Sequence, residues 1–413
     1  MIDNTKIKIE MSKYKQVQGL MNYFNLNNLK EAHKELDSNK ASGVDKITKE
    51  NYNSNLEENL NNLINKMKKF EYYPKPVKRI SIPKDNNKTR NLGIPSYEDK
   101  IVQKVIVDIL NNIYESIFLN CSYGFRPNRN AHQALLKVYN LITYMNINYI
   151  VDTDINSFFD NINQNKLIKM LKIIIKDKHF IKYIKRFLKA GIIDKNILIQ
   201  SKQGTPQGGL ISPILANIYL HYVLDLWFEN YIKKQTKGEC YLIRYADDFI
   251  ILFEYEEDSY YVYNKVIERL KEYNLQLQQE KTNIFYFSNN KITTNSFNYL
   301  GLNIYNYKDN NSIKIGLKTN DKNIKRKYED IYNYILNNKE LSLKTLCITI
   351  NNKLRGYYNY YGFSTNIEWL INIYTYTILT LREVIIKKYN LPYNLLNQYI
   401  EKVIIKPYIV INL

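Results

Sequence analysis

The sequence has few cysteines, no long apolar run and no histidine pattern of the kind that holds a metal. Its three cysteines, Cys121, Cys240 and Cys347, lie far apart, so neither a disulfide framework nor a Cys-x-x-Cys zinc site is predicted. No stretch of about 18 apolar residues occurs, and the N-terminus lacks the apolar region of a secretory signal. These absences predict an intracellular protein, cytoplasmic in a bacterium or organellar, with no membrane partner.

Positive charge, by contrast, is abundant. Lys and Arg total 59 against 40 Asp and Glu, which gives a formal net charge of +19. Such an excess favours a polyanionic partner, with nucleic acid ahead of an anionic membrane. Solubilisation by lysine is the alternative that composition leaves open. The chain of 413 residues predicts roughly two to four domains.

The most informative stretch runs over residues 241–253. Apolar residues flank an Ala-Asp-Asp corner, which predicts an antiparallel hairpin with Asp247 and Asp248 at its turn. A third carboxylate, Asp154, ends another predicted strand, and Asp152 on the same face competes with it. Carboxylates held on strands suit Mg²⁺, which prefers one or two of them together with substrate phosphates. Taken alone, the corner is equally consistent with an ordinary surface turn.

Three further segments have features that suit a nucleotide or a nucleic acid. A predicted hairpin has a basic tip, where Lys84 and Arg90 would hold a triphosphate. A glycine-rich loop over residues 203–209 allows the backbone to approach a ligand closely, and its Gln207 would help to position a nucleotide. Arg126 lies in an aromatic and basic loop of the kind that stacks bases and holds phosphates. A solvated turn, a helix cap and a structural loop are the respective alternatives.

The remaining pattern is mostly helical. Ser96 is predicted to open a helix with Asp99 as its capping-box partner. One strand, with Gly301 inside it, is predicted over residues 297–304. Helical spacing is predicted over residues 16–37, 55–70, 211–227 and from Lys318 onward.

The segment after Lys318 is basic as well as helical. Four tyrosines beside Arg355 offer a surface on which bases could stack, although the alternative is that at least two of them belong to the helix core. The cations predicted to bind nucleic acid are Lys325, Arg326, Lys327 and Arg355, and the tyrosines are Tyr357, Tyr358, Tyr360 and Tyr361.

The strand with Asp154, the glycine-rich loop and the acidic hairpin follow one another in the order of a polymerase palm. Such a site would hold two Mg²⁺ ions about 4 Å apart for an in-line displacement at phosphorus. Asp154 and Asp247 would bridge both ions, and Asp248 would be the least directly bound of the three. Phe159, five residues after Asp154, is placed to pack beneath the sugar and to exclude a ribose 2′-hydroxyl.

These motifs resemble the reverse transcriptases encoded by group II introns, over about residues 15–390. Within the resemblance, residues 299–302 look like the primer-grip strand, and Lys281 looks like the lysine of the preceding motif, which places it beside the nucleotide. The matching segments are residues 40–45, 89–95, 123–127, 154–160, 203–213, 245–248 and 354–362.

The resemblance implies an α+β fold, a right-hand polymerase whose fingers and palm contain an antiparallel sheet, followed by an α-helical thumb. No His-Asn-His cluster with paired cysteines follows the thumb, so the chain resembles the endonuclease-free members, and its last residues resemble their natural end, from which a complete chain is expected. The implied domains are an N-terminal extension (1–37), fingers and palm (38–305), a thumb or maturase domain (306–390) and a short C-terminal segment with a reduced DNA-binding region (391–413).

The implied activity is that of an RNA-directed DNA polymerase. The enzyme would extend a DNA primer on an RNA template with dNTPs and two Mg²⁺ ions, assist the splicing of its group II intron RNA as a maturase, and reach target DNA as a ribonucleoprotein. One alternative is a non-catalytic RNA-binding splicing factor, which degraded carboxylates would favour. Another is a group II-like reverse transcriptase recruited to host defence or repair, for which the gene would not be flanked by a catalytic intron RNA.

Overall fold

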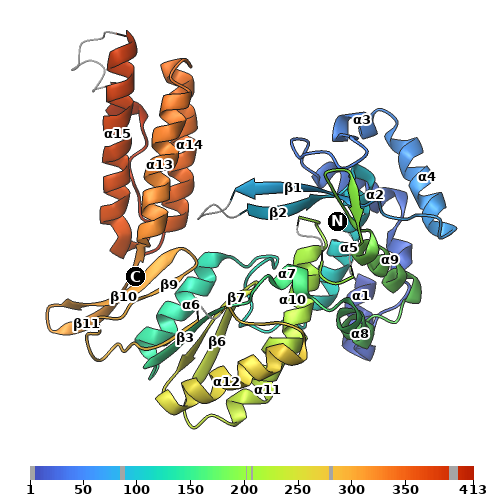
Figure 1. Cartoon of the computed structure of the whole chain (residues 1–413), viewed down its shortest axis with the longest axis horizontal. Helices are drawn as coiled ribbons and strands as arrows, with labels where there is room; N and C mark the ends of the chain where they lie inside the picture. The colour runs from blue at the N-terminus through green and yellow to red at the C-terminus, as the bar shows by residue number, and fades with distance from the viewer. Residues whose placement is uncertain (1–4, 84–88, 201, 206–207, 279–281, 390–398) are drawn as a thin grey trace. The chain divides into compact units, whose positions relative to one another are not determined.

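The computed structural model describes residues 5–83, 89–200, 202–205, 208–278, 282–389 and 399–413 (Figure 1). The chain forms two compact units. Unit 1 comprises Met1–Asn130, Val151–Leu252 and Glu257–Ile284, and unit 2 comprises Ala131–Ile150, Phe253–Glu256 and Phe285–Leu413. None of the described helices has the length and apolar content needed to cross a membrane.

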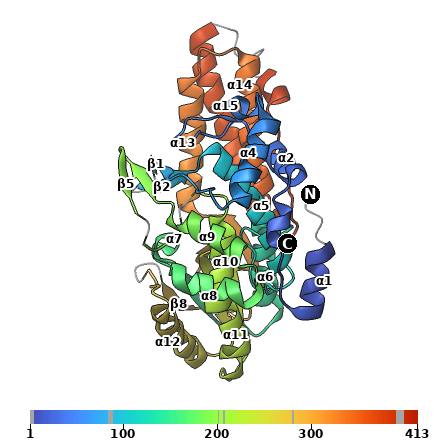
Figure 2. The same cartoon turned by 90° about the vertical axis from the view of Figure 1, so that its right-hand side faces the viewer.

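Most of unit 1 is helical, and its helices bury apolar residues at helical spacing. In α4 (Leu56–Lys68), Leu60, Leu63 and Met67 are buried, which confirms the helix predicted over 55–70. The residues predicted as one helix over 16–37 instead form a short 3₁₀ turn and α2. Figure 2 shows α8 and α9 side by side. The other helices are α1 (Thr5–Tyr14), η1 (Leu20–Tyr23), α2 (Leu26–Glu35), α3 (Lys49–Asn53), α5 (Tyr97–Tyr114), α7 (Phe158–Asn161), α8 (Gln164–Ile174), α9 (Lys178–Lys189), α10 (Ser212–Leu220), the π-helix η2 (His221–Asp225), α11 (Leu226–Asn230), η3 (Ile232–Lys234) and α12 (Glu256–Glu272).

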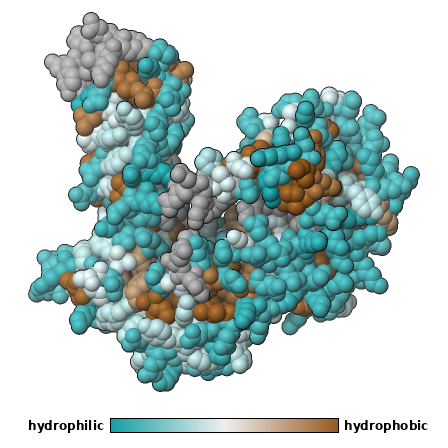
Figure 3. All heavy atoms as spheres, in the orientation of Figure 1, coloured by the Kyte–Doolittle hydropathy of each residue, from teal (hydrophilic) through white to brown (hydrophobic). Residues whose placement is uncertain are grey.

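One sheet of unit 1 contains the predicted basic hairpin. Strands β1 (Val77–Pro83) and β2 (Thr89–Ile94) pair antiparallel, as predicted, but β4 (Ile192–Asp194) pairs with β1 in parallel, so the sheet is mixed. β5 (Ile197–Ile199) forms one edge of this sheet, whose order is β2-β1-β4-β5. All three residues of β5 are exposed, and Figure 3 shows apolar atoms at the surface in this region.

A second sheet, in the order β6-β7-β3-β8, contains the acidic hairpin. Figure 1 labels β3, β6 and β7 of this sheet. Residues 249–253 of β7 are fully buried, as their unbroken apolar run predicts. The strands of this sheet are β3 (Tyr149–Asp154), β6 (Cys240–Tyr245), β7 (Asp248–Phe253) and β8 (Asn283–Tyr286).

Unit 2 combines a small antiparallel sheet with long helices. The sheet has the order β11-β10-β9, and α13 and α14 both pack against α15 (Figure 1). The α+β class and the helical C-terminal region are therefore confirmed. The elements are α6 (Ala131–Tyr144), β9 (Phe297–Tyr299), β10 (Leu302–Asp309), β11 (Ser312–Thr319), α13 (Asp321–Asn337), α14 (Leu343–Tyr361), η5 (Ser364–Asn366) and α15 (Ile367–Tyr389).

Ser96 opens α5 as predicted, since it is the N-cap residue of this helix, but the predicted capping box with Asp99 is wrong. The Ser96 side chain makes no capping hydrogen bond. Asp99 turns instead toward the preceding loop, where its carboxylate accepts hydrogen bonds from the Tyr72 hydroxyl and from the Lys75 backbone N–H. Burial raises the pKa of Asp99 to about 7.

The single strand predicted around Gly301 is also wrong, because the chain reverses there. β9 and β10 form an antiparallel hairpin whose two turn residues, Leu300 and Gly301, have φ of 49° and 79°. The turn is held by α14 and α13: the Tyr360 hydroxyl donates to Leu300 O (2.8 Å), and Asn323 Nδ2 donates to Gly301 O (3.1 Å). Positive φ at both turn residues is the signature of a type I′ hairpin, in which glycine is favoured.

We predict that Gly301→Ala destabilises the protein. The added Cβ would lie 2.8 Å from Asn323 Nδ2, and the left-handed backbone costs a residue with a Cβ about 1–2 kcal/mol. Gly356→Ala is the matched control: it lies inside α14 with no atom within 4 Å of its Cβ position, so alanine should stabilise the helix by up to about 1 kcal/mol. Urea denaturation measures both, and equal effects of the two changes would refute the account of the turn.

Candidate active site

The acidic hairpin has a two-residue turn, formed by Ala246 and Asp247, between β6 and β7. Asp248 is the first residue of β7, so the predicted hairpin is confirmed, with one of the two carboxylates in the turn and the other on the strand. Ala246 has φ of 61°, a conformation that costs roughly 1–2 kcal/mol for a residue other than glycine. Gly124 packs directly on this turn, since a Cβ there would lie 2.5 Å from Ala246 N. The strained conformation is therefore imposed by the surrounding structure.

Asp154 ends the strand next to β7. The Thr153 hydroxyl donates to Phe249 O (2.9 Å), whereas near the opposite ends of these strands Asn148 N–H donates to Phe253 O (2.9 Å), so β3 and β7 run antiparallel. The last residue of β3 and the first of β7 therefore lie at the same end of the sheet. Asp154 O also accepts a hydrogen bond from Gln278 N–H (2.8 Å), which fixes the end of the strand.

The chemistry of this sheet end fits a hard divalent cation. Asp154, Asp247 and Asp248 are all half-buried, and their oxygen atoms are the ligands that Mg²⁺ prefers. Within the described residues, no three Asp, Glu, His or Cys side chains form a preformed metal cage. A Mg²⁺ ion that takes one or two carboxylates and completes its shell with water and substrate phosphates does not need such a cage.

The glycine-rich loop is connected to Phe159 through the backbone. Thr205 N–H donates to Phe159 O (2.8 Å), and Gly204 N–H donates to Ile162 O (2.8 Å). Only a glycine fits at 204, because a Cβ there would lie 2.7 Å from Asp160 O. The Phe159 ring is half-buried and meets the Phe158 ring edge-on at 5.5 Å. The loop thus fixes α7, the helix that contains Phe159.

Beside this loop lies a cavity of about 550 Å³ with charged walls. Arg79 pairs with Asp194 (3.1 Å), and Asp160 and Lys202 also line the cavity. Burial raises the pKa of the Asp160 carboxyl, and the nearby Arg79 opposes this shift. Sequence patterns did not single out Arg79, because an arginine within an exposed strand has no distinguishing local signal.

Four residues predicted to contact the nucleotide have no described side chain. Lys84, Gln207 and Lys281 lie outside the described residues, and of Arg90 only the backbone, in β2, is described. Their assignment stays a prediction.

Arg126 has a different environment from the one predicted. Its guanidinium is almost fully buried, forms a bidentate ion pair with Glu115 (2.7 and 3.1 Å), and donates to Leu119 O and Ser122 O at 2.7 Å each. These four hydrogen bonds close the loop onto the end of α5. The geometry is that of a structural arginine, which binds its own loop instead of presenting its charge to a phosphate.

The basic segment in unit 2 lines a shallow cavity of about 360 Å³. Arg326 and Lys327 from α13 face Tyr360 and Gly356 of α14 there. The Lys327 ammonium lies 4.1 Å from the centre of the Tyr357 ring, and burial together with the neighbouring Arg326 lowers its pKa. Lys325 and Arg355 are exposed. Of the four tyrosines, Tyr357, Tyr358 and Tyr361 are buried, which confirms the alternative that at least two belong to the helix core.

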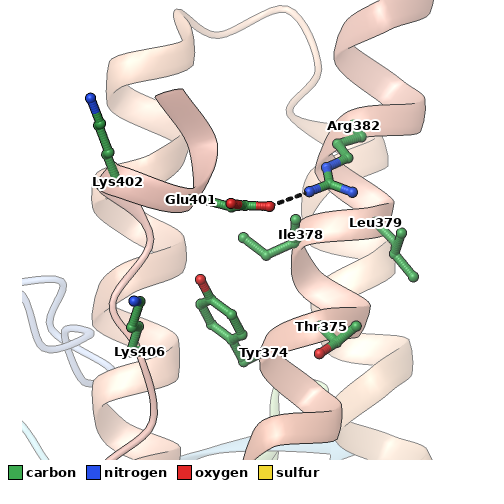
Figure 4. Close-up of a pocket in the computed structure, with 8 residues that line it drawn as sticks. All are labelled: Tyr374, Thr375, Ile378, Leu379, Arg382, Glu401, Lys402 and Lys406. Atoms are coloured by element: carbon green, nitrogen blue, oxygen red, sulfur yellow. Dashed lines mark hydrogen bonds and ion pairs between the residues drawn. The ribbon is translucent and has the colours of Figure 1, made fainter. Parts of the chain in front are cut away.

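A third cavity, of about 530 Å³, lies between α15 and residues 401–406 (Figure 4). Arg382 pairs with Glu401 (2.6 Å) across it, Tyr374 points into it, and Lys402 extends away from the ion pair. Its lining includes a second lysine, Lys406, so its charge is positive on balance.

Comparison with known proteins shows what the central part of the chain is similar to. The family model described as reverse transcriptase (RNA-dependent DNA polymerase) matches residues 82–304. The group II intron-encoded protein LtrA of Lactococcus lactis subsp. cremoris is 40% identical over 200 residues, which are 47% of this chain and 33% of LtrA. Protein YkfC of Escherichia coli is 34% identical over 241 residues, which are 51% of this chain and 62% of YkfC. The chain spans less than two thirds of the length of either relative.

Among solved structures, the telomerase of Candida albicans in complex with a fragment of telomeric RNA is similar, with a TM-score of 0.45 and 15% identity over 89% of this chain and 71% of that one. A likeness of that degree carries no argument about the site.

Proposed function

Because the chain belongs to the reverse transcriptase (RNA-dependent DNA polymerase) family, and to its group II intron type, we propose that it extends a DNA primer on an RNA template. The observation that supports this best is the position of Asp154, Asp247 and Asp248 at one end of a single sheet. In the proposal, residues 38–305 are the fingers and palm, 306–390 are the thumb, and the flanking segments are accessory.

In the proposed reaction, the three carboxylates would hold the divalent ions. Asp154 and Asp247 would hold the ions most directly, and Asp248 would contribute from the start of β7. Two bound Mg²⁺ ions would activate the primer 3′-hydroxyl and stabilise the leaving pyrophosphate. Phe159, fixed by the glycine-rich loop, packs beneath the sugar of the incoming dNTP. The triphosphate and base are held by Lys84, Arg90, Gln207 and Lys281.

We further propose that the partner RNA is a group II intron RNA and that the chain assists its splicing as a maturase, with target DNA reached through the ribonucleoprotein. The net charge of +19 and the cations of α13 around a cavity support an RNA-binding surface outside the sheet. Lys325, Arg326, Lys327 and Arg355 contribute to it. Arg126 is left out, because its donors are engaged within its own loop.

Two other functions are less well supported. A non-catalytic RNA-binding splicing factor would not need three carboxylates at the end of one sheet, and all three are present. A reverse transcriptase recruited to host defence or repair could have the same protein site. The nucleotide sequence around the gene separates that possibility, since a catalytic intron RNA there would support the maturase role.

We predict that Asp247→Ala abolishes dNTP incorporation on a primed RNA template while the protein stays folded, because the turn carboxylate would no longer hold the ions. Asp248→Ala should be the milder change. Asp309→Ala is the matched control: Asp309 also ends a strand at a hairpin, where it pairs with Lys314, far in sequence from the proposed site. Primer extension beside circular dichroism measures the effect. Substantial extension by folded Asp247→Ala would refute the assignment.

Phe159→Ala should let ribonucleotides into the product. Loss of the ring removes the surface that would clash with a 2′-hydroxyl, and we expect the preference for dNTP over rNTP, measured as the ratio of kcat/KM values, to fall by about tenfold or more. Phe158→Leu, a change in the buried neighbouring ring, is the control and should leave the preference intact. An unchanged preference in Phe159→Ala would remove this residue as the gate.

Charge reversal at Lys325, Arg326 and Lys327 to glutamate should weaken binding of structured intron RNA. The slope of log affinity against log salt concentration should become about three less steep, since fewer counterions are released. Extension of an annealed short primer–template at saturating concentration should largely survive. Reversal of Lys178, Lys182 and Lys185, three exposed lysines of α9, is the matched control. An unaltered salt slope, or joint loss of binding and extension, would contradict a separate RNA surface on α13.

A further inference from the structure

Arg244 lies directly below the acidic turn and has no exposed surface. It occupies β6, two residues before Ala246. Its guanidinium makes five hydrogen bonds: two to the Asp225 carboxylate (2.6 and 2.7 Å), and one each to Ser122 Oγ (2.8 Å), Asn217 Oδ1 (3.0 Å) and Ala246 O (2.9 Å). A guanidinium has five N–H donors, so every donor of this buried cation is used.

The hydrogen bond from Arg244 to Ala246 O connects this buried cation with the candidate metal site. Ala246 is the turn residue in the left-handed conformation, and Asp247 follows it. Its N–H side is packed against Gly124, while its carbonyl oxygen is held by Arg244. Asn217 links the two contacts, because its side chain accepts from Arg244 and donates to Gly124 O (2.7 Å). The turn is thus clamped from both sides.

The π-helix η2 is what brings Asp225 to Arg244. Asn217 and Asp225 are eight residues apart, and at about 100° per residue a regular α-helix would separate their directions by about 80°. The backbone N–H of Leu226 bonds His221 O, five residues back, so the wide turn takes up one extra residue. Asp225 then points in the direction that a residue seven positions after Asn217 would have in an α-helix, which is about 20° from the direction of Asn217. Both side chains therefore reach the same guanidinium.

We propose that Arg244, with its charge balanced by Asp225, is a positioning residue that holds the Ala246–Asp247 turn in its strained form and so sets where the Asp247 carboxylate binds a divalent ion. The inference rests on the proposed function, because it takes Asp247 as an ion ligand. It predicts that the geometry of the guanidinium matters, and not its charge alone. A lysine keeps the charge but has three donors on a single nitrogen, so it cannot bind Asp225 in bidentate fashion and also hold Ala246 O.

The test measures Mn²⁺ binding by electron paramagnetic resonance, in the complex with a dideoxy-terminated primer on an RNA template and the matching dNTP, so that no reaction occurs. Arg244→Lys should weaken Mn²⁺ binding by about tenfold or more, as loss of a residue that orients a metal ligand does. Arg186→Lys is the matched control, since Arg186 also holds backbone carbonyls, those of Phe70 and Tyr72, away from the turn. Its Mn²⁺ affinity should be unchanged.

A double variant separates positioning from stability. Arg244→Met with Asp225→Leu removes both buried charges, and apolar replacement of a buried pair is often neutral for stability. We expect its unfolding temperature to approach that of the unmodified chain while Mn²⁺ binding stays weak. If Mn²⁺ affinity recovers together with stability, Arg244 is merely structural and the proposal is overturned. Should the double variant not fold, the comparison of Arg244→Lys with Arg186→Lys decides the question.

Asp247→Asn in the same assay keeps this inference distinct from the proposed function. If Asp247→Asn leaves both Mn²⁺ affinity and primer extension unchanged, the proposed site is wrong. If Asp247→Asn abolishes them while Arg244→Lys binds Mn²⁺ like the unmodified chain, the site stands and only the positioning role is refuted.

Discussion

A buried ion pair, between Arg244 and Asp225, is the interaction on which the acidic hairpin depends. Taking two charges out of water costs several kcal/mol per ion, and that cost is offset only when the geometry is good and the remaining donors are satisfied. Here all five donors are satisfied by a helix, a loop and the hairpin turn. A shift of any one of these elements would leave part of a charge unpaired in the interior. The helix, the loop and the turn therefore keep this arrangement together or lose it together.

Much of the site could be predicted from the sequence, because its signals are local. An apolar run interrupted by Ala-Asp-Asp predicts a hairpin and puts Asp247 in its turn, and both are found. Asp154 could be predicted as a partner because it ends its own apolar strand. The α+β class follows from the same alternation of strand and helix periodicity. The pairing of β3 with β7 joins segments that are far apart in the sequence. It could still be expected, because their carboxylates must lie close together to form one metal site.

The rest depended on contacts between residues far apart in the chain. Arg244 within an apolar strand gave no hint of partners that lie 19, 27 and 122 residues away. The π-helix that delivers Asp225 has no local sequence signature. Arg126 was predicted to bind nucleic acid because it lies among aromatic and basic residues, and pattern alone could not show that Glu115 neutralises it. Gly301 was misassigned because a glycine fits both a strand irregularity and a tight turn.

The division of the chain into two units determines whether either unit can be exchanged as one continuous piece of sequence. The sequence alternates between the units in six segments, and α6 packs on β11 although about 170 residues separate them. Leu135, Val138, Leu141 and Ile142 of α6 are buried. A fragment cut out after β8 would take the long C-terminal helices but leave α6 behind. Recombination at a single junction therefore could not exchange unit 2 between related proteins intact, so its variation must come by substitution or by replacement of all its segments together.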